Sequence, residues 1–134
     1  MTRGILDTNT LILLGRMTST EALPEQPLIT SVTLAELSVG PLVTDDLTER
    51  AIRLAHLQQA ESDFEAIPFD DDAARAFGRV AADLRAAGRK PAARAFDAMI
   101  AAIAISRDLP VHTCNPRDFE AVARLTTVAV PVPD

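Results

Sequence analysis

The residues of this sequence that most clearly suggest a chemical function are acidic side chains in apolar surroundings. Asp7 lies between Ile5-Leu6 and the apolar run Leu11–Leu14. An ionised carboxylate is costly to bury without a cation or hydrogen-bond donors. Asp97 poses the same problem, because the helical spacing of RAFDAMIAAIAIS places it on a face of small apolar residues that should pack on a sheet. Such carboxylates are typical of a site that binds a cation.

The elements that must position these acids alternate between strands and helices. Short apolar runs suited to buried strands occupy residues 3–6, 27–30, 64–69, 109–113 and 127–132. Helices are predicted from Thr8 or Asn9 to Arg16, Thr33 to Gly40, Thr44 to Phe64, Asp70 to Gly88, Pro91 to Ser106 and Pro116 to Leu125. This alternation predicts one α/β domain over residues 1–134, a three-layer α/β/α sandwich with a central, mostly parallel sheet of four to five strands.

The acids fall where such a sheet would bring them together. Asp7 follows the first strand, Glu36 lies in the first turn of the helix after the second, and Asp118 follows the fourth. Asp97 lies on the helix that precedes the fourth strand. Ligands gather at the carboxyl ends of parallel strands, and carboxylates gathered there repel one another unless a cation neutralises them. Because no His or Cys accompanies them at metal-ligand spacing, Mg²⁺ or Mn²⁺ is expected rather than Zn²⁺.

Each acid also has a purely structural interpretation, which the spacing leaves open. These alternatives are a capping box with Thr33 for Glu36, an ion pair with Arg94 for Asp97, a first-turn position for Asp118, a helix cap for Asp7, and a helix start for the acids 70–72.

Composition narrows the possible functions of the protein. The net charge of −6 opposes polyanion binding, although four of the thirteen basic residues cluster between Arg85 and Arg94. With five Phe and no Trp or Tyr, base-stacking platforms are not expected. The single cysteine, Cys114, excludes an internal disulfide and a multi-cysteine zinc site. Because neither a signal-peptide pattern nor a long apolar run is present, we expect a cytoplasmic protein.

Four segments together resemble one protein family over essentially the whole chain. They are ILDTNTLI, TSVTLAELSVG, FDAMIAAIA and HTCNPRDFEAV, and in this order and spacing they are similar to the PIN domains, specifically to VapC-type toxins of toxin–antitoxin pairs. The resemblance implies a Mg²⁺-dependent endoribonuclease, with Mn²⁺ as a possible substitute, that is restrained by a small VapB-like antitoxin and forms a homodimer.

The resemblance also implies roles for individual residues. The catalytic acids would be Asp7, Glu36, Asp97 and Asp118, with Asp7 and Asp97 binding the metal. Asn115 stands where related proteins often have an acid, so either it or Asp118 fills the fourth position. Residues that would orient ligands or substrate are Thr8, Thr113 and Asn115, and residues that would contact RNA phosphates are Arg85, Arg89, Lys90 and Arg94. The antitoxin is expected in a groove between the helix over 44–64 and the one ending at Gly40.

Two other functions compete with this interpretation. A catalytically silent PIN-like domain would act only by binding protein. Asn115, which stands where related proteins often have an acid, is consistent with such a domain. A Mg²⁺-dependent phosphotransfer domain would also place aspartates at strand ends. Receiver domains, however, have paired acids and a late lysine, whereas here Asp7 stands alone and Lys90 is the single lysine.

Overall fold

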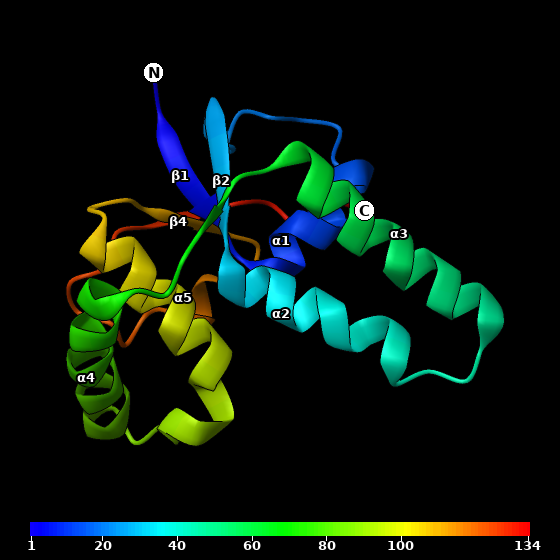
Figure 1. The fold of residues 1–134 in the computed structure, drawn as a ribbon. Helices are drawn as coiled ribbons and strands as arrows, with labels where there is room; N and C mark the ends of the chain where they lie inside the picture. The colour runs from blue at the N-terminus through cyan, green and yellow to red at the C-terminus, as the bar shows by residue number, and fades with distance from the viewer.

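Five parallel strands form the central sheet, which we describe from a computed structural model of residues 1–134 (Figure 1). In chain order they are β1 (Arg3–Leu6), β2 (Gln26–Thr30), β3 (Ala66–Ile67), β4 (Val111–Thr113) and β5 (Thr127–Ala129). Their order across the sheet is β3-β2-β1-β4-β5, and every neighbouring pair is parallel. The predicted α/β class and parallel sheet are confirmed. β1 is the switch point, because the chain leaves it towards β2 on one side and β4 later returns on the other.

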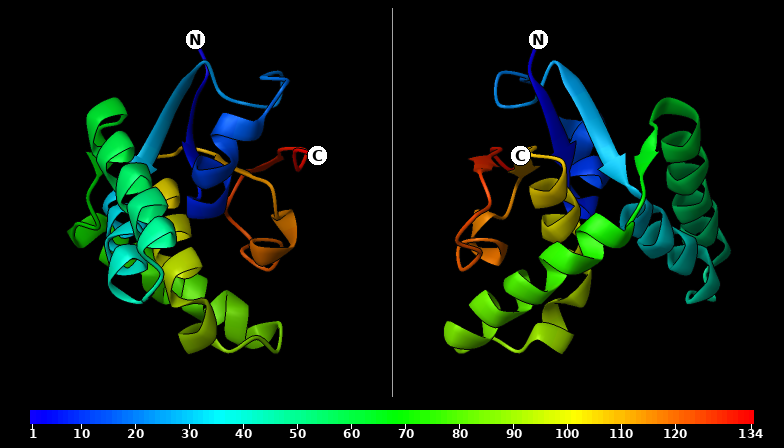
Figure 2. Two further views of the ribbon diagram at one scale, coloured as in Figure 1. Left: turned by 90° about the vertical axis from the view of Figure 1, so that its right-hand side faces the viewer. Right: turned by 60° about the vertical axis from the view of Figure 1, so that its left-hand side comes forward.

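Helices cover both faces of this sheet (Figures 1 and 2). They are α1 (Thr8–Leu13), α2 (Ser31–Val39), α3 (Leu47–Asp63), α4 (Asp71–Ala86) and α5 (Ala95–Ser106). The larger core joins α4 and α5 to the sheet through residues such as Ile5, Ile100 and Val111. A smaller core on the other face gathers residues of α1, α2 and α3 around Ile29 and Leu37. The result is the expected three-layer sandwich.

Two helix starts differ from the prediction by a few residues. α1 is capped by Asp7, whose side chain accepts from the Thr10 N–H, and not by Thr8 or Asn9. α2 is capped by Thr30, whose hydroxyl accepts from the Thr33 N–H at 3.3 Å. Thr30 still has extended backbone angles at the end of β2, so the helix begins as soon as the strand ends. The predicted cap, Thr33, therefore lies inside the first turn.

The segment before α5 and the segment after β4 are less helical than predicted. A 3-10 turn, Pro91–Arg94, precedes the helix. The expected helix from Pro116 to Leu125 is reduced to a 3-10 turn over Pro116–Asp118. Phe119 and Val122 enter the large core from this segment, while the Asp83 carboxylate accepts from the Ala123 N–H at 3.1 Å. Packing and side-chain bonds thus replace the helical hydrogen bonds there.

Close contact between β1 and β4 depends on a glycine. A Cβ added to Gly4 would lie 2.4 Å from Cδ2 of His112. His112 is buried, and its Nδ1 lies 2.9 Å from the carbonyl oxygen of Ala22. The imidazole therefore fills the space that a side chain at position 4 would need, so His112 has a structural role.

Candidate active site

Asp7 occupies the end of β1 and is 4% exposed. Its Oδ1 accepts from the Thr10 N–H at 3.3 Å, and its Oδ2 accepts from the Thr113 hydroxyl at 2.7 Å. Burial raises the pKa of Asp7, the hydrogen bonds of Thr10 and Thr113 oppose that rise, and the charge of Asp118 adds to it. Asp7 does cap a helix, yet it is also fixed from β4, 106 residues away along the chain.

Glu36 lies in the second turn of α2 and points to Thr8, not to the start of its own helix. Its Oε1 accepts from the Thr8 hydroxyl at 2.7 Å. The Thr8 and Thr33 hydroxyl oxygens are 3.0 Å apart. The proposed capping box of Thr33 and Glu36 is wrong, because Thr30 is the cap. Burial raises the pKa of Glu36, the Thr8 hydrogen bond opposes that rise, and the Asp7 charge adds to it.

Asp97 lies in the first turn of α5 and is the acid most affected by its neighbours. Burial, followed by the charges of Asp118, Asp7 and Glu36, raises its pKa from 3.8 to about 6, while Arg94 acts in the opposite direction. Because the charges of three other carboxylates act on Asp97, the four acids lie near one another at the edge of the sheet where the strands end. Arg94 pairs with Asp118 and not with Asp97, so the predicted ion pair between Arg94 and Asp97 is wrong.

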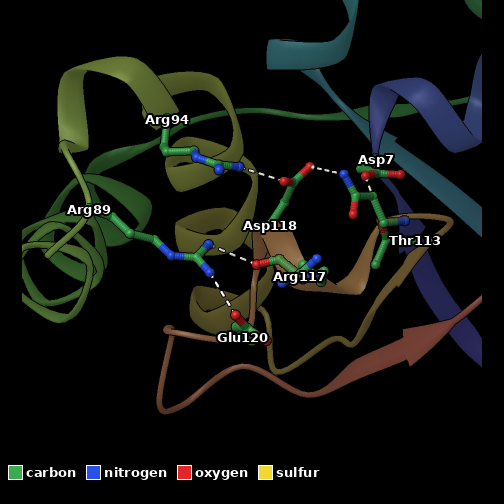
Figure 3. A network of polar contacts seen from close by, with 8 residues as sticks. Asp7, Arg89, Arg94, Thr113, Arg117, Asp118 and Glu120 are labelled. Carbon is green, nitrogen blue, oxygen red and sulfur yellow. Dashed lines mark hydrogen bonds and ion pairs between the residues drawn. The ribbon is translucent and has the colours of Figure 1, made fainter. Parts of the chain in front are cut away.

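Asp118 is held by two donors in the 3-10 turn that follows β4 (Figure 3). Its Oδ1 accepts from Nη1 of Arg94, and its Oδ2 accepts from Nδ2 of Asn115 at 3.0 Å. The backbone N–H of Asn115 in turn donates to the Thr113 hydroxyl at 2.9 Å. Thr113 therefore connects Asp7 to the turn that carries Asp118.

The basic cluster between Arg85 and Arg94 divides into two kinds of residue. Arg89 donates to the Arg117 carbonyl oxygen and to Glu120 Oε1, both at 2.7 Å, and so joins the end of α4 to the turn after β4 (Figure 3). Arg94 is engaged with Asp118. Arg85 and Lys90 are exposed and form no ion pair. Two of the four predicted phosphate contacts are thus bonded within the protein.

Sequence reasoning missed several residues that support the acids. The Thr10 hydroxyl is fully buried and accepts from the Cys114 N–H at 2.9 Å. Thr33 is equally buried beside Thr8. Arg89 and Glu120 form the ion pair described above. The sequence did contain an indication of the role of the threonines, because a hydroxyl side chain follows each of the apolar strands that end at the site.

A hollow of about 380 Å³ opens beside the site, between α1 and α3. Apolar side chains such as Leu11, Ile12 and Phe64 line it together with His56. A second hollow of about 300 Å³ shares Ile12, Leu37 and His56 with the first and reaches Thr8 and Glu36. The two hollows form one surface, the α1–α3 groove, that runs up to the acids.

The antitoxin is expected between the helix over 44–64 and the helix ending at Gly40, whereas this groove is also lined by α1. Leu37 is 6% exposed, and Leu34 and Leu57 pack against the smaller core. Leu54 is exposed but does not line the groove. The exposed apolar side chains in the groove are instead Ile12 and Ile52.

Oxygen ligands dominate the region, and three of the acids have no cationic side chain within 4.0 Å. These three are Asp7, Glu36 and Asp97. No three acidic, histidine or cysteine side chains form a ready-made metal cluster. Buried carboxylates whose pKa values are raised by burial and by neighbouring acids, without a counter-cation, form a donor set that suits a hard divalent ion. None of the helices is sufficiently long and apolar to span a membrane.

Comparison with known proteins places this arrangement in a family. The PIN domain family model matches residues 5–125. Ribonuclease VapC5 of Mycobacterium tuberculosis is 41% identical, over 95% of this chain and 93% of that protein. The tRNA(fMet)-specific endonuclease VapC of Shigella flexneri is 38% identical over 74% of this chain and 71% of its own length.

Solved structures agree with the sequence comparison. The toxin–antitoxin structure VapBC-5 of M. tuberculosis has a chain that superposes with a TM-score of 0.80 at 39% identity, covering 97% of this chain and 100% of that chain. DNA-bound VapBC of Salmonella typhimurium gives a TM-score of 0.73 at 31% identity, covering 95% and 97%. Members of the PIN family are nucleases that generally depend on a divalent metal ion. By its matched residues, its fold and its relatives, the chain belongs to the PIN-domain family, among the VapC ribonucleases.

Proposed function

We propose that this protein is an endoribonuclease, the toxin of a type II toxin–antitoxin pair, that hydrolyses RNA phosphodiester bonds with Mg²⁺ at the carboxylate site. The observation that carries the proposal is the meeting of Asp7, Glu36, Asp97 and Asp118 at one sheet edge, where burial and neighbouring carboxylates raise the pKa of Asp7, Glu36 and Asp97 and Arg94 is the only counter-cation. Relatives that cover most of the chain are named ribonucleases, and their solved structures are toxin–antitoxin complexes.

The donor set fits Mg²⁺, with Mn²⁺ as an alternative. Asp7 and Asp97 would hold the ion, because both are acids without a cationic partner and neighbouring carboxylates contribute to the raised pKa of each. Binding requires the carboxylates to draw together, since they form no ready-made cluster. A bound ion would supply positive charge for the scissile phosphate and acidity for the attacking water.

The protein's own groups would orient the other reactants. Thr113 holds Oδ2 of Asp7, so the acid keeps one orientation. Thr8 holds Oε1 of Glu36, which leaves Oε2 to accept a hydrogen bond, and then a proton, from the attacking water. Arg85 and Lys90 have no ion-pair partner and are available for RNA phosphates. A local basic rim of this kind allows a protein of net charge −6 to bind RNA.

An antitoxin would bind in the α1–α3 groove. The groove has exposed apolar side chains at Ile12 and Ile52 and leads directly to Thr8 and Glu36. An amphipathic partner helix could place its apolar face there and extend a basic side chain to the acids, where it would compete with the metal ion. The family resemblance adds a homodimer and action on RNA in the cytoplasm to this proposal.

The test is RNA cleavage by the purified chain in the presence and absence of divalent ions. We expect cleavage with Mg²⁺ or Mn²⁺, none with EDTA, and loss of activity in both Asp7→Asn and Asp97→Asn. Asp45→Asn is the matched control, because Asp45 is an exposed loop acid without an ion pair. Cleavage that persists in EDTA contradicts the mechanism. A folded protein that binds antitoxin yet cuts no RNA would favour the silent protein-binding domain.

A further inference from the structure

Asp118 differs from the other three acids because one of the two protein donors on its oxygens is a cation, the Arg94 guanidinium. Arg94 Nη1 donates to Oδ1, and Asn115 Nδ2 donates to Oδ2 at 3.0 Å (Figure 3). The Asp118 side chain is 16% exposed, so water competes weakly for these bonds. The charge of this acid is therefore already balanced within the protein.

Arg94 is well placed for a lasting role at the site. It is the last residue of the 3-10 turn Pro91–Arg94 and directly precedes α5, whose first turn carries Asp97. Its charge also acts on Asp97. Only one of its N–H groups has a partner in the protein, so the others remain free to donate to a phosphate oxygen.

A second divalent ion at Asp118 would meet two obstacles. The ion would have to replace the bonds from Arg94 and Asn115, and it would then lie beside a guanidinium that stays protonated at any relevant pH. Asn115 also contributes an amide where a carboxylate could have helped to offset that repulsion. The four carboxylates and Arg94 together carry a charge of −3, which one divalent ion reduces to −1 and which two would reverse to +1.

We propose that Arg94 takes the place of a second metal ion, so that the protein binds one divalent ion through Asp7 and Asp97 while the Arg94 guanidinium supplies the positive charge at Asp118. This inference rests on the proposed metal-dependent function. Arg94 then has two partners in turn, Asp118 in the free protein and additionally a phosphate of the bound RNA. Asp118 is a positioning residue for Arg94 and not a ligand of the ion.

The test counts Mn²⁺ ions bound to the EDTA-treated protein, by calorimetric titration and electron paramagnetic resonance. We expect one Mn²⁺ for each wild-type chain. Arg94→Gln should bind a second ion at least tenfold more tightly than any second binding in the wild type, because Asp118 is then free. Arg94→Lys should restore a count of one. Arg79→Gln is the charge-matched control, since it removes an exposed positive charge of α4 that has no ion pair, and its count should stay at one.

A second variant keeps the test decisive if Arg94→Gln does not fold. In Asp118→Asn the Mn²⁺ affinity should stay within about threefold of wild type, whereas a direct ligand would cost tenfold or more. A wild-type count of two, a count of one in a folded Arg94→Gln, or a large loss in Asp118→Asn overturns this inference while leaving the metal-dependent nuclease intact. A wild-type count of zero instead contradicts the proposed function itself.

Discussion

Replacing Asp97 with asparagine should stabilise the metal-free protein at neutral pH. Burial and the charges of Asp118, Asp7 and Glu36 raise the pKa of Asp97 from 3.8 to about 6. At pH 7.5 the folded wild type must therefore keep an unfavourable charge that the Asp97→Asn variant lacks. The difference between the two pKa values corresponds to about 3 kcal/mol, at about 1.4 kcal/mol for each pH unit. Because Asp97 is only half-buried, solvent screening reduces the expected gain to about 1–2 kcal/mol.

The pH dependence distinguishes this electrostatic effect from a general change in packing. A group with a raised pKa in the folded state contributes stability at low pH that is lost as the pH rises through the folded value. The stability advantage of Asp97→Asn over wild type should therefore shrink as the pH falls below about 6 and be mostly lost by pH 4. It should vanish only well below pH 3.8, where Asp97 is protonated in the folded and unfolded states alike.

Urea denaturation of the EDTA-treated proteins at pH 7.5, 6, 5 and 4 measures both quantities. Asp45→Asn serves as the control, because it removes an exposed charge outside the site, and its effect should be small and independent of pH. A loss of stability in Asp97→Asn at pH 7.5 would refute the reasoning, since it would mean that Asp97 forms a stabilising contact. A gain that stays constant down to pH 4 would refute the electrostatic cause.

Three further changes test other parts of the structure. Thr113→Val should weaken Mn²⁺ binding at least tenfold, because it removes the hydroxyl that fixes Asp7, a proposed metal ligand; unchanged affinity in a calorimetric titration would count against that role. Gly4→Ala should lower the free energy of unfolding by about 1–3 kcal/mol, since its Cβ would lie 2.4 Å from His112. Gly15→Ala, with open space around the added carbon, is the control, and equal effects would disprove the steric argument. Ile52→Glu should weaken antitoxin binding at least tenfold in a pull-down or titration, because it places a charge in the apolar groove; full affinity would put the partner on another face.

The position of the acids could be predicted because it depends on buried strands, and apolar runs in the sequence indicate where those strands lie. The three residues directly before Asp7, Gly4-Ile5-Leu6, are apolar, so they predict a buried parallel strand, and the acid must then emerge at the strand's carboxyl end. The partners of the acids could not be predicted in this way. Arg94 is three residues from Asp97 but bonds to Asp118, because the turn after β4 comes within reach of its long side chain.

The errors in the predicted helix boundaries also arise from contacts between distant parts of the chain. Thr30 and Thr33 are both good caps by residue type, and the choice between them depends on where β2 stops pairing with its neighbours, which is a property of the sheet. The helix predicted after Pro116 has an adequate local pattern. It is displaced by core packing of Phe119 and by the bonds of Arg89, both of which connect distant parts of the chain.

The pairing of Asp7 with Thr113 spans 106 residues of sequence, and this span has a consequence during synthesis. A growing chain that ends at Ser106 already contains Asp7, Glu36 and Asp97, but it lacks β4 and the turn that carries Asp118. Domains form on the ribosome as their segments emerge, so β1 has no β4 beside it until this late segment leaves the exit tunnel. With the site proposed above, the nuclease would lack Thr113 and Asp118 until this late segment emerges, so it would be unable to cleave its own message during translation. An antitoxin that binds the α1–α3 groove as proposed, whose residues emerge first, would have time to do so before that sheet edge is complete.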